Sequence, residues 1–229
     1  MYAAVFAFVC ITNLFSNFIA LNNTDIVNTI VASNAGCIIF PVIFELIYLK
    51  ESLSFNKYLA VFILIIVVFQ PFFEKNIKIK SNIKGNIACM MICAFSGLQV
   101  IILKLYTMTL NVKSNDVFCL WTNILTIPMV FIISIINSKG LTQLINDVKK
   151  IRIKTYFIAF GGMILTSLVT LMNINILKNI NVSTFSVLKF SFSLVFTSIF
   201  ARIFLKESLT KKEFLNLVLS SIAVYLNIM

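Results

Sequence analysis

Residues 47–54 of the chain read IYLKESLS, and residues 203–210, 156 positions later, read IFLKESLT. The five residues LKESL are identical in the two copies, and each copy lies between two long apolar runs. The preceding segments also correspond at this offset, because residues 21–26 (LNNTDI) align with residues 177–182 (LKNINV). We interpret the match as an internal repeat, in which each copy runs through a helix, a turn and a last apolar helix.

The composition indicates the environment in which these helices lie. Hydrophobic residues make up 60% of the 229 residues, charged residues only 12%, and the mean hydropathy is +1.01. A soluble domain is about half apolar and a quarter charged, and one globular core could not bury this excess. The composition therefore excludes a soluble enzyme and a disordered or fibrous protein, and it predicts an integral membrane protein. Topology and anionic lipids explain the net charge of +11, so we expect no nucleic-acid partner.

Eight apolar runs have lengths suited to helices that cross about 30 Å of hydrocarbon. Such continuous runs favour helices, because the strands of a membrane β-barrel alternate between apolar and polar residues. The sequence therefore predicts an all-α polytopic membrane protein with eight transmembrane helices. The predicted spans are residues 2–21, 26–49, 57–73, 85–107, 115–137, 155–176, 182–205 and 212–228.

The repeat also predicts how the two copies are oriented. Equivalent spans, such as 26–49 and 182–205, are five helices apart, so the second copy crosses the membrane in the opposite direction. Inverted repeats of this kind are typical of alternating-access transporters. We assign residues 1–83 to a first repeat and residues 84–229 to a second repeat of five helices. The offset then implies that two helices are missing before Met1, through a truncated gene model or descent from a ten-helix (5+5) ancestor.

The repeated turns resemble those of the drug/metabolite transporter superfamily, particularly its nucleotide-sugar and triose-phosphate branch. In that family the fourth helix of each repeat ends in an apolar-(Gly or other)-Glu-x-Leu-Ser/Thr turn, which residues 49–54 and 205–210 match with Lys at the Gly position. Residues 85–104 resemble the sixth helix of the family. The resemblance covers nearly the whole chain and implies the third to tenth helices of a ten-helix transporter. Glu51 and Glu207 lie in the repeated turns, and we expect structural roles for them.

Lys189 is the leading candidate for substrate binding, because a charge inside a membrane span costs roughly 2.5–3.5 kcal/mol. It lies seven residues beyond Val182, and Ser186 and Ser193 share its helix face at i−3 and i+4. An ammonium flanked by hydroxyls suits a phosphate or diphosphate. The resemblance implies a lysine that meets substrate phosphate in this helix. The alternative is a lysine that snorkels to the lipid headgroups.

Glu45 is a second candidate charge inside a span. It could line the cavity, couple transport to a proton, or pair with Arg202 at the nearly equivalent position of the second repeat. The alternative is a charge at the membrane interface.

Uncharged polar residues mark the helix faces that we expect to point inward. Asn13 and Asn17 are four residues apart on the first span, Asn34 lies on the second and Gln99 on the fourth. Hydrogen bonds between helices, worth about 0.6 kcal/mol each, would explain them equally well. Together they favour a polar cavity. The predicted substrate-binding residues are Lys189, Ser186, Ser193, Asn34, Asn13, Asn17 and Gln99.

We expect no catalytic residue, no cofactor and no metal. The chain has no His, and its five cysteines lie inside apolar runs without other ligand types. We interpret them as small buried hydrophobes. The sequence also lacks the motifs of zinc proteases and serine hydrolases.

The predicted function is a carrier of nucleotide sugars or phosphorylated organic solutes, working by alternating access as an antiporter. One alternative is a drug, amine or amino-acid carrier of the same superfamily, in which Glu45 would matter more than Lys189. Another is a degenerate, non-transporting membrane subunit, which the two missing helices favour. The expected partners are a phosphorylated small molecule and the lipid bilayer, and a homodimer is left open. The family implies a Golgi or endoplasmic reticulum membrane.

Overall fold

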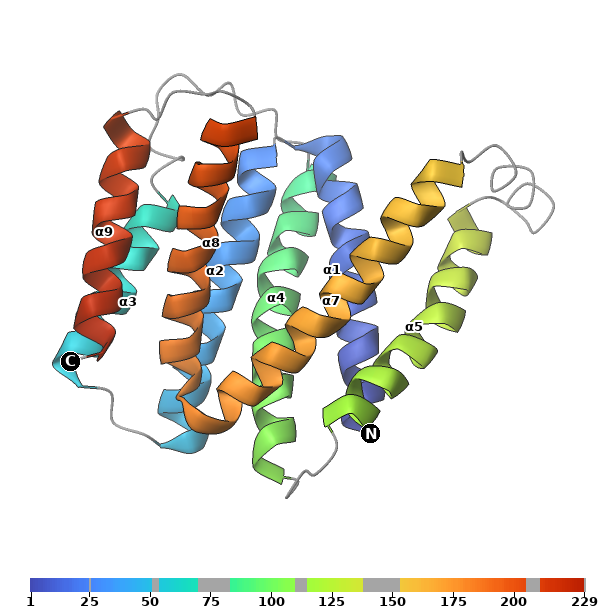
Figure 1. The fold of residues 1–229 in the computed structure, drawn as a ribbon, viewed down its shortest axis with the longest axis horizontal. Helices are drawn as coiled ribbons and strands as arrows, with labels where there is room; N and C mark the ends of the chain where they lie inside the picture. The colour runs from blue at the N-terminus through green and yellow to red at the C-terminus, as the bar shows by residue number, and fades with distance from the viewer. Residues whose placement is uncertain are drawn as a thin grey trace. The chain divides into compact units, whose positions relative to one another are not determined.

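The computed structural model describes residues 1–24, 26–50, 54–69, 83–109, 115–137, 153–204 and 211–228. Every regular element in these ranges is helical, and each of the eight predicted spans corresponds to one α-helix, with a π-helix completing the span 26–49. Residues 70–73 and 205 of the predicted spans lie outside the described residues. The predicted fold class, an all-α polytopic membrane protein, is therefore confirmed. The elements (Figure 1) are α1 (Tyr2–Asn23), α2 (Ile26–Phe44), the π-helix η1 (Glu45–Leu49), α3 (Phe55–Phe69), α4 (Ile83–Thr109), α5 (Asn115–Asn137), α7 (Ile153–Asn179), α8 (Val182–Phe204) and α9 (Lys211–Ile228).

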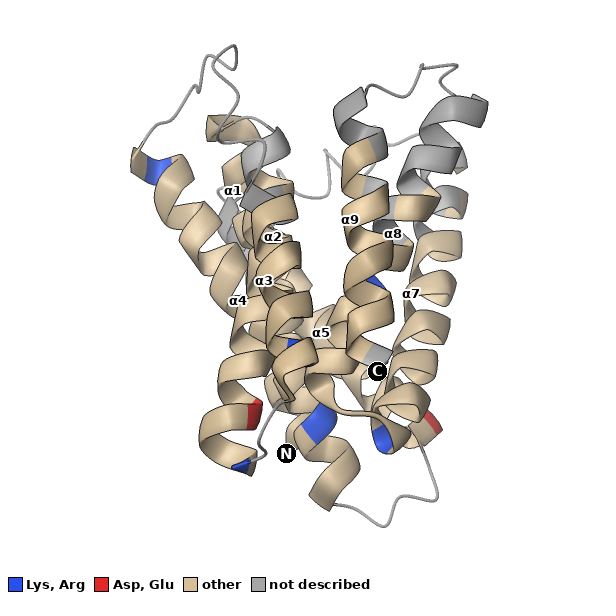
Figure 2. Cartoon of the chain, turned by 90° about the vertical axis from the view of Figure 1, so that its left-hand side faces the viewer, with Lys and Arg blue, Asp and Glu red and all other residues tan. Residues whose placement is uncertain are grey.

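The described helices have the lengths and composition of membrane spans. Inside a membrane a helix satisfies its backbone N–H and C=O groups without water, which is why these apolar runs are helical. Lys, Arg, Asp and Glu are sparse along them (Figure 2). Shorter apolar helical segments are also present in α3, α8 and α9. Five segments are long and apolar enough to cross a membrane: Tyr2–Asn23, Ala32–Leu49, Ile83–Thr109, Asn115–Ile132 and Phe160–Asn179.

The helix boundaries recur at the offset of the sequence repeat. Three pairs of boundaries are each separated by 156 positions, so the sequence repeat has a counterpart in the backbone. The ends of α1 and α7 are Asn23 and Asn179, the starts of α2 and α8 are Ile26 and Val182, and the starts of α3 and α9 are Phe55 and Lys211.

The helices form two compact units, and each unit combines segments from early and late in the chain. The first unit comprises Met1–Thr12 and Ile102–Asn179, which include the start of α1, the end of α4, and helices α5 and α7. The ring of Phe118 on α5 lies 4.2 Å from that of Tyr106 on α4 and 5.5 Å from that of Phe6 on α1, between ring centroids. These aromatic contacts join three helices of the unit.

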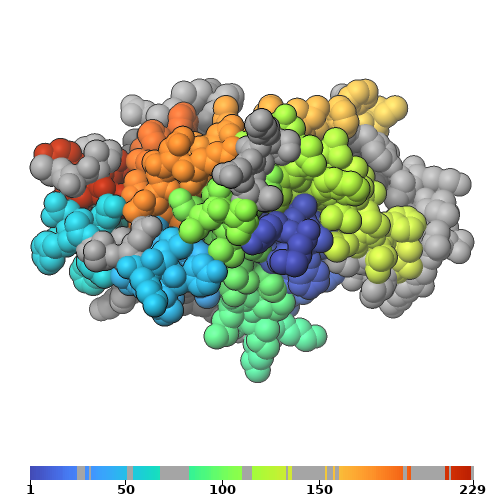
Figure 3. Space-filling model, turned by 90° about the horizontal axis from the view of Figure 1, so that it is seen from below, coloured from blue at the N-terminus to red at the C-terminus, as the bar shows by residue number. Residues whose placement is uncertain are grey.

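The second unit comprises Asn13–Ile101 and Ile180–Met229. Within it α3 packs against α9, and α2 packs against α8. The members of each pair lie side by side in Figure 1, and the view from below shows the cyan residues of α3 next to the dark red residues of α9 (Figure 3). Each pair consists of helices that correspond under the offset of 156.

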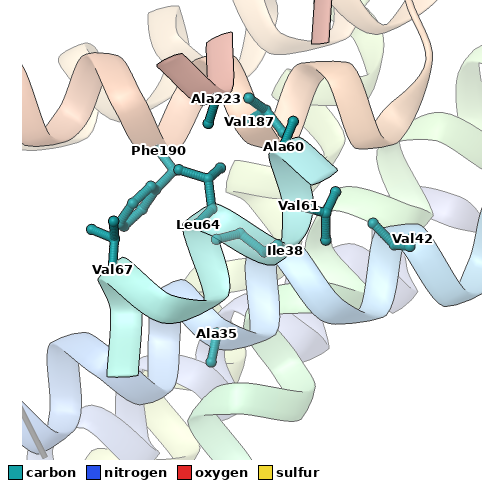
Figure 4. Close-up of a cluster of buried hydrophobic side chains, with 10 residues drawn as sticks. All are labelled: Ala35, Ile38, Val42, Ala60, Val61, Leu64, Val67, Val187, Phe190 and Ala223. Atoms are coloured by element: carbon teal, nitrogen blue, oxygen red, sulfur yellow. The ribbon is translucent and has the colours of Figure 1, made fainter. Parts of the chain in front are cut away.

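The hydrophobic core of the second unit lies between these four helices (Figure 4). Leu64 of α3 and Val187 of α8 are completely buried, and Ile38 of α2 is almost completely buried. The core therefore joins helices from both copies of the repeat. Its buried members are Ala35, Ile38, Val42, Ala60, Val61, Leu64, Val67, Val187, Phe190 and Ala223.

Candidate functional site

The residues that the sequence singles out gather in one part of the fold. All predicted site residues whose side chains are described belong to the second unit, namely Asn13, Asn17, Asn34, Glu45, Gln99, Ser186 and Lys189. The others lie outside the described part of the molecule, which omits the side chains of Ser193 and Arg202 and the whole of Glu51 and Glu207. The site can therefore be built from α1, α2, η1, α4 and α8.

The second membrane span changes its helical form before it ends. Pro41, which is completely buried, cannot donate a backbone hydrogen bond to the carbonyl one turn earlier. One turn later the helix widens into η1, and it ends at Lys50. Lys50 has φ 52° and ψ 29°, the left-handed conformation that favours Gly, and its N–H donates to the carbonyl of Glu45. Single π-turns inside longer helices are frequent at functional sites.

Glu45, the first residue of η1, connects this span to α8. Its side chain is 0% exposed, and its Oε1 accepts a 2.8 Å hydrogen bond from the backbone N–H of Ser183. Ser183 is the second residue of α8, where backbone N–H groups have no partner within the helix. Negative charge is also favourable near a helix N-terminus. Glu45 therefore caps α8 from a neighbouring helix.

Three buried oxygen atoms on Glu45 and on the first turns of α8 have no hydrogen-bond partner among the described residues. They are Oε2 of Glu45, Oγ of Ser183 and Oγ of Ser186. Ser183 and Ser186 are 0% and 2% exposed, and their spacing of three residues places them on one face of α8. Buried polar atoms usually have partners, so the hydrogen bonding of these three atoms is incomplete within the described residues.

Lys189 lies one helical turn beyond Ser186 on α8, and its side chain is exposed. Its Nζ is 5.9 Å from the centroid of the Phe185 ring, within the range of a cation–π interaction. The ammonium group is thus exposed and lies over an aromatic ring of its own helix.

Helices α2 and α4 cross in direct backbone contact. A β-carbon placed on Gly36 would lie 1.9 Å from the carbonyl oxygen of Cys93, and one placed on Gly97 would lie 2.4 Å from Cβ of Phe40. No larger side chain fits at either position without movement of the backbone or of a packed ring. Small residues at such crossings allow close packing of membrane helices.

Polar contacts accompany this crossing. The hydroxyl oxygens of Ser33 and Ser96 are 3.1 Å apart, and the thiol of Cys37 donates to the carbonyl oxygen of Ser96 at 3.7 Å. Ser33 and Cys37 were not among the predicted site residues, although their spacing of four on the second span places them on one helix face. The contacts therefore connect α4 to α2.

The remaining predicted polar residues differ in their environments. Asn17 donates through Nδ2 to the backbone oxygen of Asn13 at 2.8 Å and to its Oδ1 at 3.3 Å, so these bonds are within α1 rather than between helices. Asn34 and Gln99 are partly buried on α2 and α4.

A cation in the first unit was not among the predicted residues. Nζ of Lys104 on α4 donates a 2.9 Å hydrogen bond to the carbonyl oxygen of Leu177, two residues before the end of α7. Positive charge is favourable at a helix C-terminus, where carbonyl groups have no partner within the helix. The sequence feature that could have identified Lys104 is its position inside the predicted span 85–107.

Metal ligands do not gather in the described part of the chain. No group of three or more His, Cys, Asp or Glu side chains there could hold a metal ion. The five cysteines are free thiols. The chemically distinctive groups of the described second unit are thus the exposed ammonium of Lys189 and the buried carboxyl group of Glu45.

Comparison with known protein families agrees with this helical architecture. Residues 83–229, more than half of the chain, match the model of the EamA-like transporter family. The chain belongs to the EamA-like transporter family. The matched range begins with α4 and contains α5, α7, α8 and α9. No match was found among curated proteins.

Membership of this family confirms the predicted drug/metabolite transporter superfamily and a polytopic membrane transporter fold. EamA-like proteins are membrane transporters rather than enzymes, and they act on small molecules from within a lipid bilayer. The family leaves the substrate class unspecified.

Proposed function

We propose that this EamA-like transporter carries nucleotide sugars or other phosphorylated organic solutes by alternating access, as an antiporter. Substrate phosphate would bind at Lys189 on α8. Ser186, Ser193, Asn34, Asn13, Asn17 and Gln99 would contribute hydrogen bonds to the rest of the substrate.

The exposure of Lys189 carries this proposal. An ammonium seven residues beyond the start of an apolar helix is costly unless it serves a ligand or reaches water. Its Nζ lies over the ring of Phe185, so a cation–π contact holds the group against α8. Charge-assisted hydrogen bonds from such a group to phosphate oxygens are among the stronger polar interactions.

The pairing of equivalent helices supports alternating access. We infer a first repeat of residues 1–83 and a second repeat of residues 84–229, with opposite orientations in the membrane. In the second unit α2 contacts α8 and α3 contacts α9, and each contact joins a helix to its counterpart at the offset of 156. Rocking of one repeat against the other would change these contacts, as in other transporters built from inverted repeats.

Two alternatives rest on other features. A carrier of amines, amino acids or drugs would use Glu45 as its anionic group, but Glu45 is fully buried and its Oε1 already accepts the N–H of Ser183. A degenerate, non-transporting subunit would need neither charge. The exposed ammonium favours the phosphate carrier over both.

The proposed setting is a Golgi or endoplasmic reticulum membrane, where nucleotide sugars cross, and the protein could act there as a homodimer. Glu51 and Glu207 would have structural roles in the repeated turns.

Transport by the purified protein tests this function. Proteoliposomes loaded with unlabelled UDP-glucose or glucose 6-phosphate are mixed with the same radiolabelled compound outside, and exchange is measured. We expect exchange by the wild type and a loss of about tenfold or more in Lys189→Ala, because a charge-assisted hydrogen bond is worth roughly 1.5–3 kcal/mol.

Two further variants make the result specific. Lys189→Arg keeps the positive charge and should retain part of the exchange. Lys84→Ala removes an exposed lysine in the first turn of α4 and should leave exchange unchanged. Exchange of tetraethylammonium in place of both phosphate compounds would instead support the amine carrier, and exchange of none of the three would favour the non-transporting subunit.

A further inference from the structure

The two oxygen atoms of Glu45 have different environments. Oε1 accepts the N–H of Ser183, whereas Oε2 is buried and has no hydrogen-bond partner among the described residues. An ionised carboxylate that is removed from water normally has a counter-charge or several hydrogen bonds. Glu45 has one hydrogen bond in the described part of the structure, so its charge is incompletely compensated.

No described titratable side chain on the surrounding elements supplies the missing compensation. None of them makes an ion pair or a hydrogen bond with Glu45 in the ranges that the structure describes. The cationic ones nearest in sequence to this junction are Lys50, which follows η1 and is exposed, and Lys189, two turns beyond Ser183. In the second unit the described titratable side chains on these elements are Cys37 on α2, Tyr48 and Lys50 at the end of η1, Lys57 and Tyr58 on α3, Lys84, Cys89 and Cys93 on α4, Lys189 on α8 and Tyr225 on α9.

The hydroxyl groups of Ser183 and Ser186 add a second observation. Both are buried on one face of α8, both belong to the helix end that Glu45 caps, and neither has a partner among the described residues. A protonated carboxyl group donates one hydrogen bond, and a serine hydroxyl can accept it. A sodium ion would need several more oxygen ligands and a cavity, whereas a proton needs no added volume. The complete burial of Glu45 therefore favours a proton.

We propose that Glu45 is a proton-binding site that couples proton movement to transport. In the unprotonated form the carboxylate caps α8 through Ser183. On proton uptake the carboxyl group becomes neutral, its attraction to the N-terminus of α8 weakens, and its new O–H donates to a serine hydroxyl of α8. The proton comes from water on one side of the membrane and is released to the other. The coupling to transport rests on the proposed carrier function, but proton binding does not.

The location of Glu45 explains how one proton could act on a whole helix. Glu45 lies in the π-turn that follows Pro41, where the span has already lost its regular hydrogen-bond pattern. The contact with Ser183 joins elements that are 138 positions apart in the chain. A change at this contact would alter the packing of α2 on α8, the helix that carries Lys189.

Infrared difference spectroscopy of the full chain in liposomes tests proton binding without any substrate. The probe is the proton alone, and pH is changed from acid to alkaline in sodium-free buffer. We expect a carbonyl-stretch band of a protonated buried carboxyl group that disappears as pH rises. The band should be lost in Glu45→Gln, which keeps an oxygen that can accept the N–H of Ser183 but cannot bind or release the proton.

Two more variants assign the band. Asp116→Asn removes an exposed carboxyl group in the first turn of α5 and should leave the band unchanged. Glu45→Asp keeps a carboxyl group and should shift the band, which assigns it to this position even if Glu45→Gln does not fold. The proposal is overturned if the wild type has no such band, if the band is unchanged in both Glu45 variants, or if sodium instead of pH changes the carboxylate signal.

Transport measurements then distinguish proton binding from carrier function. Where the wild type exchanges UDP-glucose or glucose 6-phosphate, an imposed pH gradient should drive net accumulation, and Glu45→Gln should lose accumulation while keeping exchange. Equal accumulation in wild type and Glu45→Gln would overturn the coupling. A titrating band in a protein that carries neither compound would reject the proposed substrates and retain the proton site.

Discussion

The α-carbon of Gly36 is so close to the backbone of Cys93 that an added β-carbon would lie 1.9 Å from the Cys93 carbonyl oxygen. The partner is backbone rather than the end of a flexible side chain, so it cannot move aside on its own. Helices α2 and α4 therefore depend on a glycine at their crossing.

Gly36→Ala tests this dependence. We expect a loss of about 1–3 kcal/mol in the free energy of unfolding, because the added methyl group overpacks the crossing. Thermal unfolding in detergent, followed by circular dichroism, measures the change. Gly161→Ala on α7 is the matched control, because no atom lies within 4 Å of its added β-carbon. The control should be neutral or slightly stabilising, since Ala favours the helix more than Gly does. Equal stability of the two variants would contradict the close crossing.

Replacement of Glu45 tests its capping of α8. Glu45→Ala leaves the N–H of Ser183 without its acceptor and should cost about 1.5–3 kcal/mol, the range for a hydrogen bond to a charged group. Glu45→Gln keeps an acceptor oxygen and should cost clearly less. The measurement is the unfolding midpoint in detergent for both variants. A smaller loss in Glu45→Ala than in Glu45→Gln would be inconsistent with the cap.

Lys50 offers a test in which stability should increase. At φ 52° a side chain with a β-carbon is strained by about 1–2 kcal/mol, and Gly is not, although Gly also gives the unfolded chain more freedom. Lys50→Gly should therefore raise the free energy of unfolding by up to about 1 kcal/mol. Lys57→Gly, inside α3, should lower it by a similar amount. The two glycine variants should thus move in opposite directions in one thermal assay.

Lys104 provides a test in the first unit. Lys104→Met removes the donor to the Leu177 carbonyl while keeping an unbranched apolar side chain, and we expect a loss of about 0.5–1.5 kcal/mol. Because the contact is at the end of α7, hydrogen exchange of the last turn of that helix should increase most. Lys84→Met, on an exposed lysine in the first turn of α4, is the control. Uniform exchange along α7 in both variants would argue against a local cap.

The fold could be predicted from the sequence further than the site could. Continuous apolar runs decide which segments span the membrane, and the eight predicted spans are helical wherever they are described, because a chain in lipid has few other ways to satisfy its backbone. The offset of 156 in the sequence related equivalent turns of the two repeats. The starts of α2 at Ile26 and α8 at Val182 are separated by the same offset. The π-turn after Pro41 was not predicted, because proline indicates a disturbed helix without specifying its form.

The site depends on contacts between distant segments, which a single sequence does not specify. Glu45 was recognised as a charge inside a span, but its partner is a backbone group 138 positions away. Every residue has a backbone N–H, so no residue type marks Ser183 as that partner. The contact of Gly36 with Cys93 could not be predicted either, because the group that Gly36 approaches is also backbone. Lys189 was recognised because its charge is unusual in an apolar run, and the structure adds its exposure and its place over Phe185.

The shared core of α2, α3, α8 and α9 also bears on how the protein is made. Ile38 and Val187 belong to one buried cluster, yet 149 positions separate them along the chain. A chain that enters the membrane from its N-terminus must hold α2 and α3 in lipid, with their contact faces uncovered, while the intervening helices are still being synthesised. During that interval the small residues of α2 could pair with the wrong helix. Helices α8 and α9, which are synthesised after α4, α5 and α7, are thus the ones that complete the packing of α2 and α3.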